Sequence, residues 1–137
     1  QTTRSSMSKK ALAVEQENAV WIVDDDVLIA RVLSHWLMQR GFEVEIIKNG
    51  RDAIETMAVS RPPKLVLLDI MMPFADGFEV LSRLRSTRSW KKVPVIMLTS
   101  KSSEASVVQA FEGGADDYVT KPFKLPELMA RMNRLMK

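Results

Sequence analysis

Short apolar segments alternate with longer amphipathic segments from residue 19 to the end of the chain. Five segments have the length and pattern of strands: residues 19–23, 42–47, 65–68, 94–99 and 117–120. Most are apolar runs bounded by turn residues, which is typical of strands buried on both faces of a parallel sheet. The segment at 42–47 alternates between apolar and polar positions, which also predicts a strand.

Apolar residues recur at helical spacing in the segments that follow each strand. The predicted helices occupy residues 27–40, 50–60, 77–86, 104–112 and 125–136. Glycine or proline ends several of them: Gly41 follows the first helix, Pro62 the second and Gly113 the fourth. The chain therefore contains five strands that alternate with five helices.

This alternation predicts an α/β fold, (βα)5, in which a five-stranded parallel sheet carries helices on both faces, because right-handed crossovers connect successive parallel strands. A chain of 137 residues has the length of a single domain. We assign the domain to residues 19–137. Residues 1–18 are polar and aperiodic, so we predict a flexible N-terminal arm, and the residues before Met7 look like an addition from expression.

Composition and charge exclude several classes of protein. The absence of cysteine excludes disulfides and thiolate metal sites and suits a reducing compartment. No apolar run has the length of a membrane span and no signal peptide opens the chain, so we expect a cytoplasmic protein without a membrane partner. The net charge is only +3, and no segment combines Lys and Arg with interleaved aromatic residues, so we expect no nucleic-acid partner for this domain.

Polar residues stand directly after four of the predicted strands. Asp24 and Asp25 follow the first strand, Asp69 follows the third, Thr99 ends the fourth and Lys121 follows the fifth. The carboxyl ends of parallel strands meet along one edge of a sheet, where ligands bind in open α/β folds, so these side chains should converge. Taken alone, Asp69 could equally be a turn residue. Its convergence with the other four favours a chemical role.

The charges of this set predict a metal site and a phosphoryl acceptor. Carboxylates 4 Å apart repel by about 4 kcal/mol per pair at an effective dielectric constant of 20, so the cluster requires a cation. Without cysteine, and with a single histidine in the chain, the oxygen ligands favour Mg²⁺, or Mn²⁺, over zinc. A carboxylate beside a divalent ion, an ammonium group and a hydroxyl is equipped to accept a phosphoryl group, with Asp69 attacking in line.

Four motifs occur in an order and spacing that resemble the receiver domain of two-component response regulators. The motifs are IVDDD at 22–26, LLDIMMP at 67–73, LTS at 98–100 and DYVTKPF at 117–123. The resemblance covers residues 19–137 and implies a flavodoxin-like sheet of strand order 2-1-3-4-5. It also implies a signalling switch rather than an enzyme, phosphorylated by a sensor histidine kinase or a phosphotransfer protein.

The resemblance implies a role for each matching residue. Asp69 would be the phosphoacceptor, Asp25 a direct Mg²⁺ ligand and Asp24 a ligand through water. The backbone carbonyl of Met71 would be a further ligand, and Lys121 would bind the phosphoryl group. The resemblance also implies that Thr99 is the switch hydroxyl and Tyr118 the switch aromatic residue. It further implies a cis peptide bond between Lys121 and Pro122.

Four other polar or sulfur-containing residues need a separate interpretation. Asp26 is interpreted as the N-terminal cap of the first helix rather than a metal ligand. Met71 and Lys101 each follow a site residue by two positions, where side chains border the path of hydrolytic water, so they would tune the lifetime of the phosphoryl group. His35 lies mid-helix, and we interpret it as a surface residue rather than a phosphodonor.

The output surface implied by the resemblance consists of the helix at 104–112, the strand at 117–120 and the last helix. Asp116, Asp117 and Arg131 could form part of a charged homodimer contact on this surface. The helix at 104–112 offers Gln109 and no basic residue, so the charge pattern of such a contact is incomplete.

Two alternative functions remain open. A Mg²⁺-dependent phosphatase with an aspartyl nucleophile would carry an acid/base aspartate two residues further on, where this chain has Met71. The second alternative is a receiver-like scaffold that has lost the switch. Such a scaffold would lack some of the expected residue types, whereas this chain has all of them.

Overall fold

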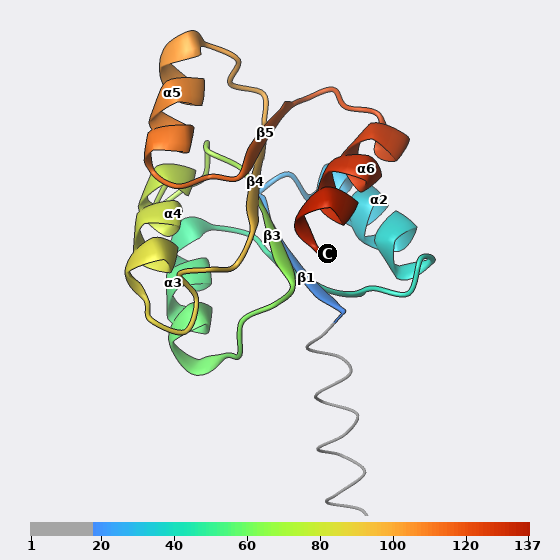
Figure 1. Ribbon diagram of the computed structural model, residues 1–137, viewed down its shortest axis with the longest axis horizontal. Helices are drawn as coiled ribbons and strands as arrows, with labels where there is room; N and C mark the ends of the chain where they lie inside the picture. Colours follow the sequence, from blue (N-terminus) through green and yellow to red (C-terminus); the bar gives the residue numbers. More distant parts are fainter. Residues whose placement is uncertain (1–17) are drawn as a thin grey trace, which may run out of the picture.

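The structure, a computed structural model, describes residues 18–137. Five parallel strands form one sheet in the order β2-β1-β3-β4-β5. Helices cover both faces of this sheet, with α3, α4 and α5 on one side and α2 and α6 on the other (Figure 1). The predicted α/β class and strand order are therefore confirmed.

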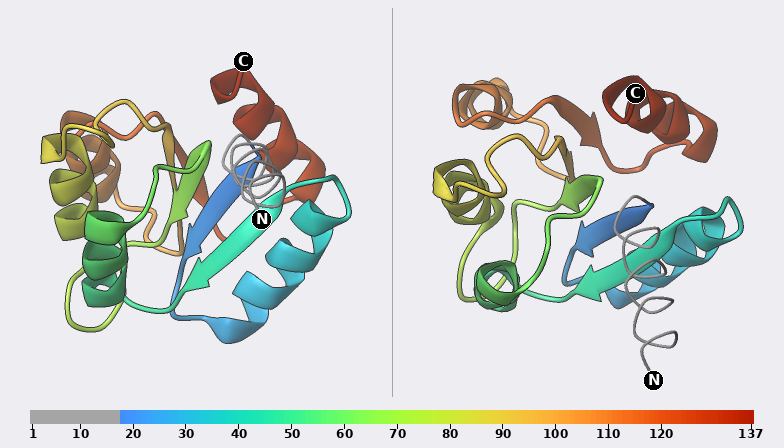
Figure 2. Two further views of the ribbon diagram at one scale, coloured as in Figure 1. Left: turned by 90° about the horizontal axis from the view of Figure 1, so that it is seen from below. Right: turned by 60° about the horizontal axis from the view of Figure 1, so that its bottom comes forward.

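The boundaries of the elements agree with the sequence pattern to within two residues. The strands are β1 (Ala19–Val23), β2 (Glu43–Ile47), β3 (Leu65–Leu68), β4 (Val95–Thr99) and β5 (Asp117–Thr120). The helices are α2 (Val27–Met38), α3 (Gly50–Val59), α4 (Gly77–Ser86), α5 (Glu104–Glu112) and α6 (Leu125–Leu135). Two further views, one of them from below, show the helices as two layers with the sheet between them (Figure 2).

The central strand β3 is buried along its whole length and divides the core in two. Val66 and Leu68 pack into the cluster formed with α3, α4 and α5. Leu65 and Leu67 pack into the cluster formed with α2 and α6. Alternate side chains of a strand point to opposite faces, which is why a continuous apolar run suits a sheet covered on both sides. This packing fixes the end of β3, where Asp69 follows.

Asp26 is the N-cap of α2, as predicted. Its side-chain oxygen Oδ1 accepts hydrogen bonds from the backbone N–H groups of Leu28 and Ile29 at 3.1 and 3.2 Å. His35 is exposed on the same helix, in agreement with its interpretation as a surface residue.

The prediction for residues 1–18 falls almost entirely outside the described residues, so the arm stays a prediction. Within residues 18–137, no helix is long and apolar enough to cross a membrane. The cytoplasmic location likewise stays a prediction.

Candidate functional site

Three carboxylates meet at the carboxyl ends of β1 and β3. Asp24, Asp25 and Asp69 each offer an oxygen atom, and these oxygens all lie within 4.8 Å of one another. Asp24 and Asp69 are only 3% and 6% exposed, whereas Asp25 is exposed. The backbone N–H of Asp69 donates to the carbonyl of Val23, which ties the end of β3 to the end of β1. The sheet edge thus gathers the acidic residues that the strand-end pattern singled out.

Lys121 supplies the positive charge of this cluster. Its Nζ donates to Oδ2 of Asp24 at 2.7 Å and to Oδ2 of Asp69 at 3.3 Å. The second oxygen of each carboxylate accepts a hydrogen bond from the backbone. The N–H of Asp26 donates to Oδ1 of Asp24 at 2.9 Å, and the N–H of Ile70 donates to Oδ1 of Asp69 at 2.7 Å. The Lys121–Pro122 peptide bond is cis.

Burial and charge act against each other on the titration of this pair. Burial raises the pKa of Asp24, because it disfavours the ionised carboxyl more than Lys121 and the Asp26 N–H favour it. Burial alone would lower the pKa of Lys121, but its hydrogen bond to Asp24 and the charges of Asp24 and Asp69 raise it. Lys121 is therefore held protonated, while the carboxyl of Asp24 takes up a proton more readily than a free one.

The donor set fits a hard divalent cation. Three carboxylates face one ammonium group, so the cluster carries a formal excess of two negative charges. Within residues 18–137, no side-chain hydrogen bond or ion pair occupies the carboxylate of Asp25. All three acidic groups offer oxygen atoms, the ligand type that Mg²⁺ takes. The exposed Met71 and Lys101 line, together with Asp25, a shallow cleft of about 470 Å³ beside the cluster.

Thr99 and Tyr118 are joined through the backbone of Lys101. Thr99 is fully buried at the end of β4, and its Oγ1 accepts a hydrogen bond from the N–H of Lys101 at 3.3 Å. The hydroxyl of Tyr118 donates to the carbonyl of Lys101 at 2.7 Å. Burial, followed by the negative charge of Asp69, raises the pKa of Tyr118. The sequence indicated both residues but not this connection, because the backbone groups of Lys101 carry no sequence signal.

The residues proposed for a dimer contact have partners within the chain. Nη1 of Arg131 lies 3.0 Å from Oδ2 of Asp117, and Nη2 lies 3.2 Å from Oε1 of Glu127. The hydrogen bonds to Asp117 and Glu127, in that order, raise the pKa of Arg131. Oδ2 of Asp116 accepts from Nη2 of Arg85 at 2.9 Å.

Two residues make close contacts that the sequence does not predict: Gly77 beside the site, and Arg85 at the opposite end of the sheet. Gly77 packs against the phosphoacceptor candidate: a Cβ atom on Gly77 would lie 2.2 Å from the carbonyl oxygen of Asp69. The Asp76-Gly77 pair indicates a turn in the sequence, but not this close approach to Asp69. Arg85 donates to the carbonyls of Gly114 and Val93, and these long-range contacts leave no local pattern in the sequence.

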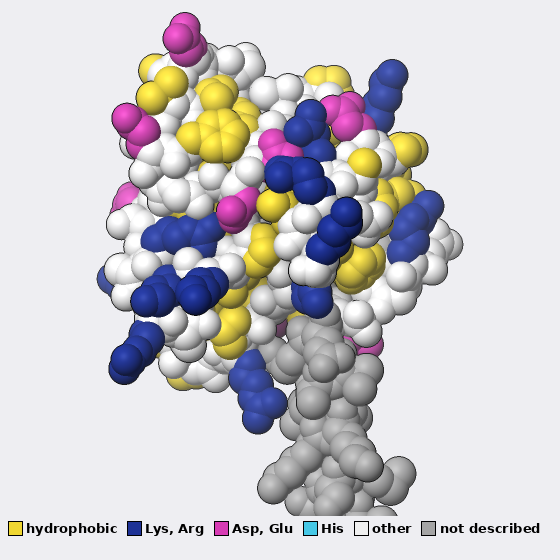
Figure 3. Space-filling view, viewed as in Figure 1, with side chains coloured by type: hydrophobic (Ala, Val, Ile, Leu, Met, Phe, Trp, Pro, Cys, Tyr) yellow, Lys and Arg dark blue, Asp and Glu magenta, His cyan; other side chains and the backbone are white. Residues whose placement is uncertain are grey.

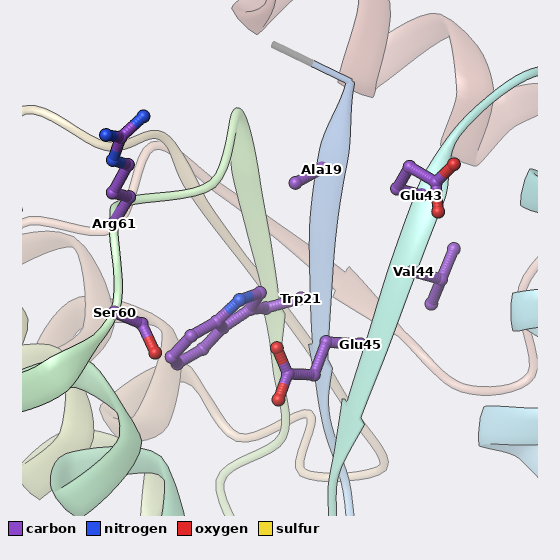
Figure 4. Close-up of a pocket in the computed structure, with 7 residues that line it drawn as sticks. All are labelled: Ala19, Trp21, Glu43, Val44, Glu45, Ser60 and Arg61. Carbon is purple, nitrogen blue, oxygen red and sulfur yellow. The ribbon is translucent and has the colours of Figure 1, made fainter. Parts of the chain in front are cut away.

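A separate pocket lies at the opposite end of the sheet. It has a volume of about 310 Å³ and contains none of the candidate site residues. Figure 4 shows the ring of Trp21 extending toward Ser60, with Glu43 and Glu45 on the side of β2. No chemistry predicted from the strand ends falls in this pocket.

A family model described as the response regulator receiver domain matches residues 20–133. The chain belongs to the receiver-domain family of response regulators. It is 42% identical over 118 residues to the response regulator MprA of Mycolicibacterium vanbaalenii, an alignment that covers 86% of this chain and 50% of MprA. The chain thus spans about half the length of that relative.

Solved receiver domains share the fold. The receiver domain of a signal transduction histidine kinase from Syntrophus aciditrophicus has a TM-score of 0.80 and 35% identity, covering 87% of this chain and 89% of that one. The receiver domain of the sensor histidine kinase PA1611 from Pseudomonas aeruginosa, which has magnesium coordinated in its active-site cleft, has a TM-score of 0.79 and 25% identity, covering 87% and 97%. The chain is accordingly a two-component signalling module rather than an enzyme.

Proposed function

We propose that Asp69 accepts a phosphoryl group and that this modification switches the domain. The observation that carries the proposal is the position of Lys121, whose ammonium lies within hydrogen-bonding distance of both Asp24 and Asp69. An ammonium beside a strand-end carboxylate can bind an oxygen of an incoming phosphoryl group without leaving the site.

We further propose that Asp24, Asp25 and the carbonyl of Met71 hold Mg²⁺, or Mn²⁺, next to Asp69. When bound, the ion would supply positive charge to the phosphoryl oxygens. The exposed Asp25 is suited to direct coordination, and the buried Asp24, already bonded to Lys121, is suited to a contact through water.

Phosphoryl transfer would come from the phosphohistidine of a sensor kinase or phosphotransfer protein. An oxygen of Asp69 forms the new P–O bond as the P–N bond breaks, and the departing imidazole nitrogen recovers a proton from solvent. The N-terminal half of α2 begins directly after the acidic cluster and exposes Val27, Leu28 and Val32. These apolar side chains offer a contact surface to a donor protein.

The change of state would pass through Thr99 and Tyr118. On phosphorylation, the hydroxyl of Thr99 would give up its hydrogen bond with the N–H of Lys101 and bond to a phosphoryl oxygen instead. The hydrogen bond from Tyr118 to the Lys101 carbonyl would break at the same time, so that the ring of Tyr118 can move. Met71 and Lys101 border this site and would affect hydrolysis of the phosphoryl group.

We propose that the surface of α5, β5 and α6 forms a homodimer after phosphorylation. Val108 and Phe111 of α5 are 47% and 46% exposed, and hydrophobic side chains are visible over α5 in Figure 3. Arg131 would exchange its partner Asp117 within the chain for Asp116 or Asp117 of the second copy. In the Phe111→Asp variant, phosphorylation at Asp69 should no longer change the sedimentation rate of the protein. The control variant Val59→Asp alters an exposed valine on α3 and should still dimerise on phosphorylation.

Labelling with acetyl phosphate tests the main proposal. The protein should gain the mass of one phosphoryl group in the presence of Mg²⁺ and none in EDTA. Asp69→Asn should not be labelled, and Asp26→Asn, which preserves the helix cap, should be labelled like the parent. A parent protein that stays unlabelled would favour the scaffold alternative, and an Asp69→Asn protein that still gains the mass would refute Asp69 as the acceptor.

A further inference from the structure

The end of the domain opposite to the acidic cluster is basic. Residues 83–92 contain five Lys or Arg residues and no Asp or Glu. Arg88, Lys91 and Lys92 are exposed in the loop between α4 and β4, and Lys64 is exposed just before β3. Figure 3 shows dark blue side chains gathered at the lower left, where this loop lies in Figure 1.

The basic loop is held in place by two residues. Trp90 is fully buried, and its ring packs edge-on against that of Trp21 with centroids 4.7 Å apart. Nη1 of Arg85 donates to the carbonyls of Lys91 and Val93 at 3.0 and 2.7 Å. The neighbouring basic side chains therefore extend from a fixed backbone, which reduces the entropy lost when they bind a partner.

The loop borders a shallow cleft with an apolar floor and a lysine rim. The cleft has a volume of about 340 Å³. Its apolar lining includes Pro63, Val93, Leu135 and Met136, and the lysines that line it are Lys64, Lys92 and Lys137. An occupant must therefore combine negative charge with at least one apolar group.

Arg85 pairs with Asp116, but the lysines of the cleft rim and the loop have no such partner within the described part of the chain. None of the ion pairs among residues 18–137 involves Lys64, Arg88, Lys91 or Lys92. Asp69 lies five residues beyond Lys64 along β3, a separation of about 16 Å at the rise of a strand. This exceeds the Debye length of about 8 Å at physiological ionic strength, so the acidic cluster does not offset the charge of the rim.

We propose that this cleft binds an acidic segment of a partner protein, in which an apolar side chain enters the cleft and flanking carboxylates meet Lys64 and Lys92. A nucleic acid fits the surface less well. Trp90 is the one aromatic residue among the basic residues at 83–92, and because its ring is fully buried it cannot stack on a base. The apolar floor also offers nothing to a phosphate backbone. The proposed contact is independent of phosphorylation at Asp69.

Nuclear magnetic resonance titration tests this proposal with three probes. The first is a short helical peptide of Glu, Ala and Leu, the second has Ser in place of each Leu, and the third is a DNA duplex of similar length. The first peptide should shift the amide signals of Ser89, Lys92 and Val93, and it should bind about tenfold more tightly than the Ser peptide. The DNA should bind more weakly than the first peptide.

Charge reversal supplies the matched controls. Lys64→Glu/Lys92→Glu should weaken binding of the first peptide by about tenfold or more, whereas Arg31→Glu/Lys48→Glu, which reverses two exposed charges elsewhere, should leave it unchanged. Both double variants should still be labelled at Asp69 by acetyl phosphate, which shows that they are folded. Equal binding of the two peptides, tighter binding of DNA, signal changes away from the cleft or an equal loss in both double variants would each overturn the proposal.

Discussion

The ammonium of Lys121 lies 2.7 Å from Oδ2 of Asp24, and the two side chains are only 11% and 4% exposed. Removing one partner of a buried ion pair leaves the other charge unpaired. We therefore expect Lys121→Met to lower the free energy of unfolding by on the order of 3 kcal/mol in EDTA. Urea denaturation at neutral pH measures this loss.

A double variant separates the ion pair from the packing of the lysine stem. Lys121→Met leaves two buried carboxylates, Asp24 and Asp69, without their partner. Lys121→Met/Asp24→Asn leaves only Asp69 in that state, so the loss of stability should be smaller than in Lys121→Met alone. If the double variant loses as much free energy of unfolding as Lys121→Met and Asp24→Asn lose together, the two residues do not stabilise each other.

Magnesium should stabilise the protein through Asp25. A ligand that binds only the folded state adds about 2.7 kcal/mol at one hundred times its dissociation constant, so the melting temperature should rise with Mg²⁺ concentration. Asp25→Asn should abolish this rise and leave the stability in EDTA close to that of the parent, because the carboxylate is exposed and unpaired within residues 18–137. Asp26→Asn should respond to Mg²⁺ like the parent. Thermal unfolding in a Mg²⁺ series tests all three proteins, and an unchanged response in Asp25→Asn would contradict its role.

The elements and the acidic cluster could be predicted because both follow from local pattern plus one topological rule. The apolar run from Leu65 to Leu68 favours a strand buried on two faces, and parallel strands bring their ends together, so the pattern predicts that Asp24 and Asp69 approach each other. That step requires no knowledge of contacts between individual side chains. The rule fixes which residues share an edge, and not which atoms bond.

Contacts between side chains that are distant in the sequence could not be predicted from the local pattern of apolar and polar residues. The sequence predicts a dimer contact for Asp116 and gives no sign of its partner within the chain, Arg85, which lies 31 residues away. Phe74 adopts a backbone φ of 75°, which bulky residues rarely do, and nothing in its neighbourhood of the sequence requires it. Such details depend on packing in three dimensions, which local periodicity does not encode.

Gly77 should be intolerant of any side chain. A Cβ atom there would lie 2.2 Å from the backbone oxygen of Asp69, and the backbone cannot move aside without displacing the acceptor. We expect Gly77→Ala to cost about 3 kcal/mol, at the upper end of overpacking effects, and to slow labelling by acetyl phosphate.

Gly41→Ala is the control for the loss of a glycine. Gly41 has a φ of +89° and open space around its Cα, so alanine there should cost about 1 kcal/mol of backbone strain and leave labelling unchanged. Similar losses in the two variants would contradict a steric role for Gly77. Denaturation and labelling of both proteins make the comparison.

Stability should fall as the pH rises above about 10, because the pKa values of Lys121 and Tyr118 are both raised in the folded state. The unfolded chain loses these protons first, so between the unfolded and folded pKa values the native state binds more protons and the free energy of unfolding decreases with pH. The contribution of each group is fully present below its unfolded pKa. Lys121→Met and Tyr118→Phe should each reduce the slope of stability against pH in this range, although both are less stable at pH 8. Urea denaturation in EDTA from pH 8 to 11 measures the slopes, and a steeper decline in either variant than in the parent would contradict the direction of the corresponding shift.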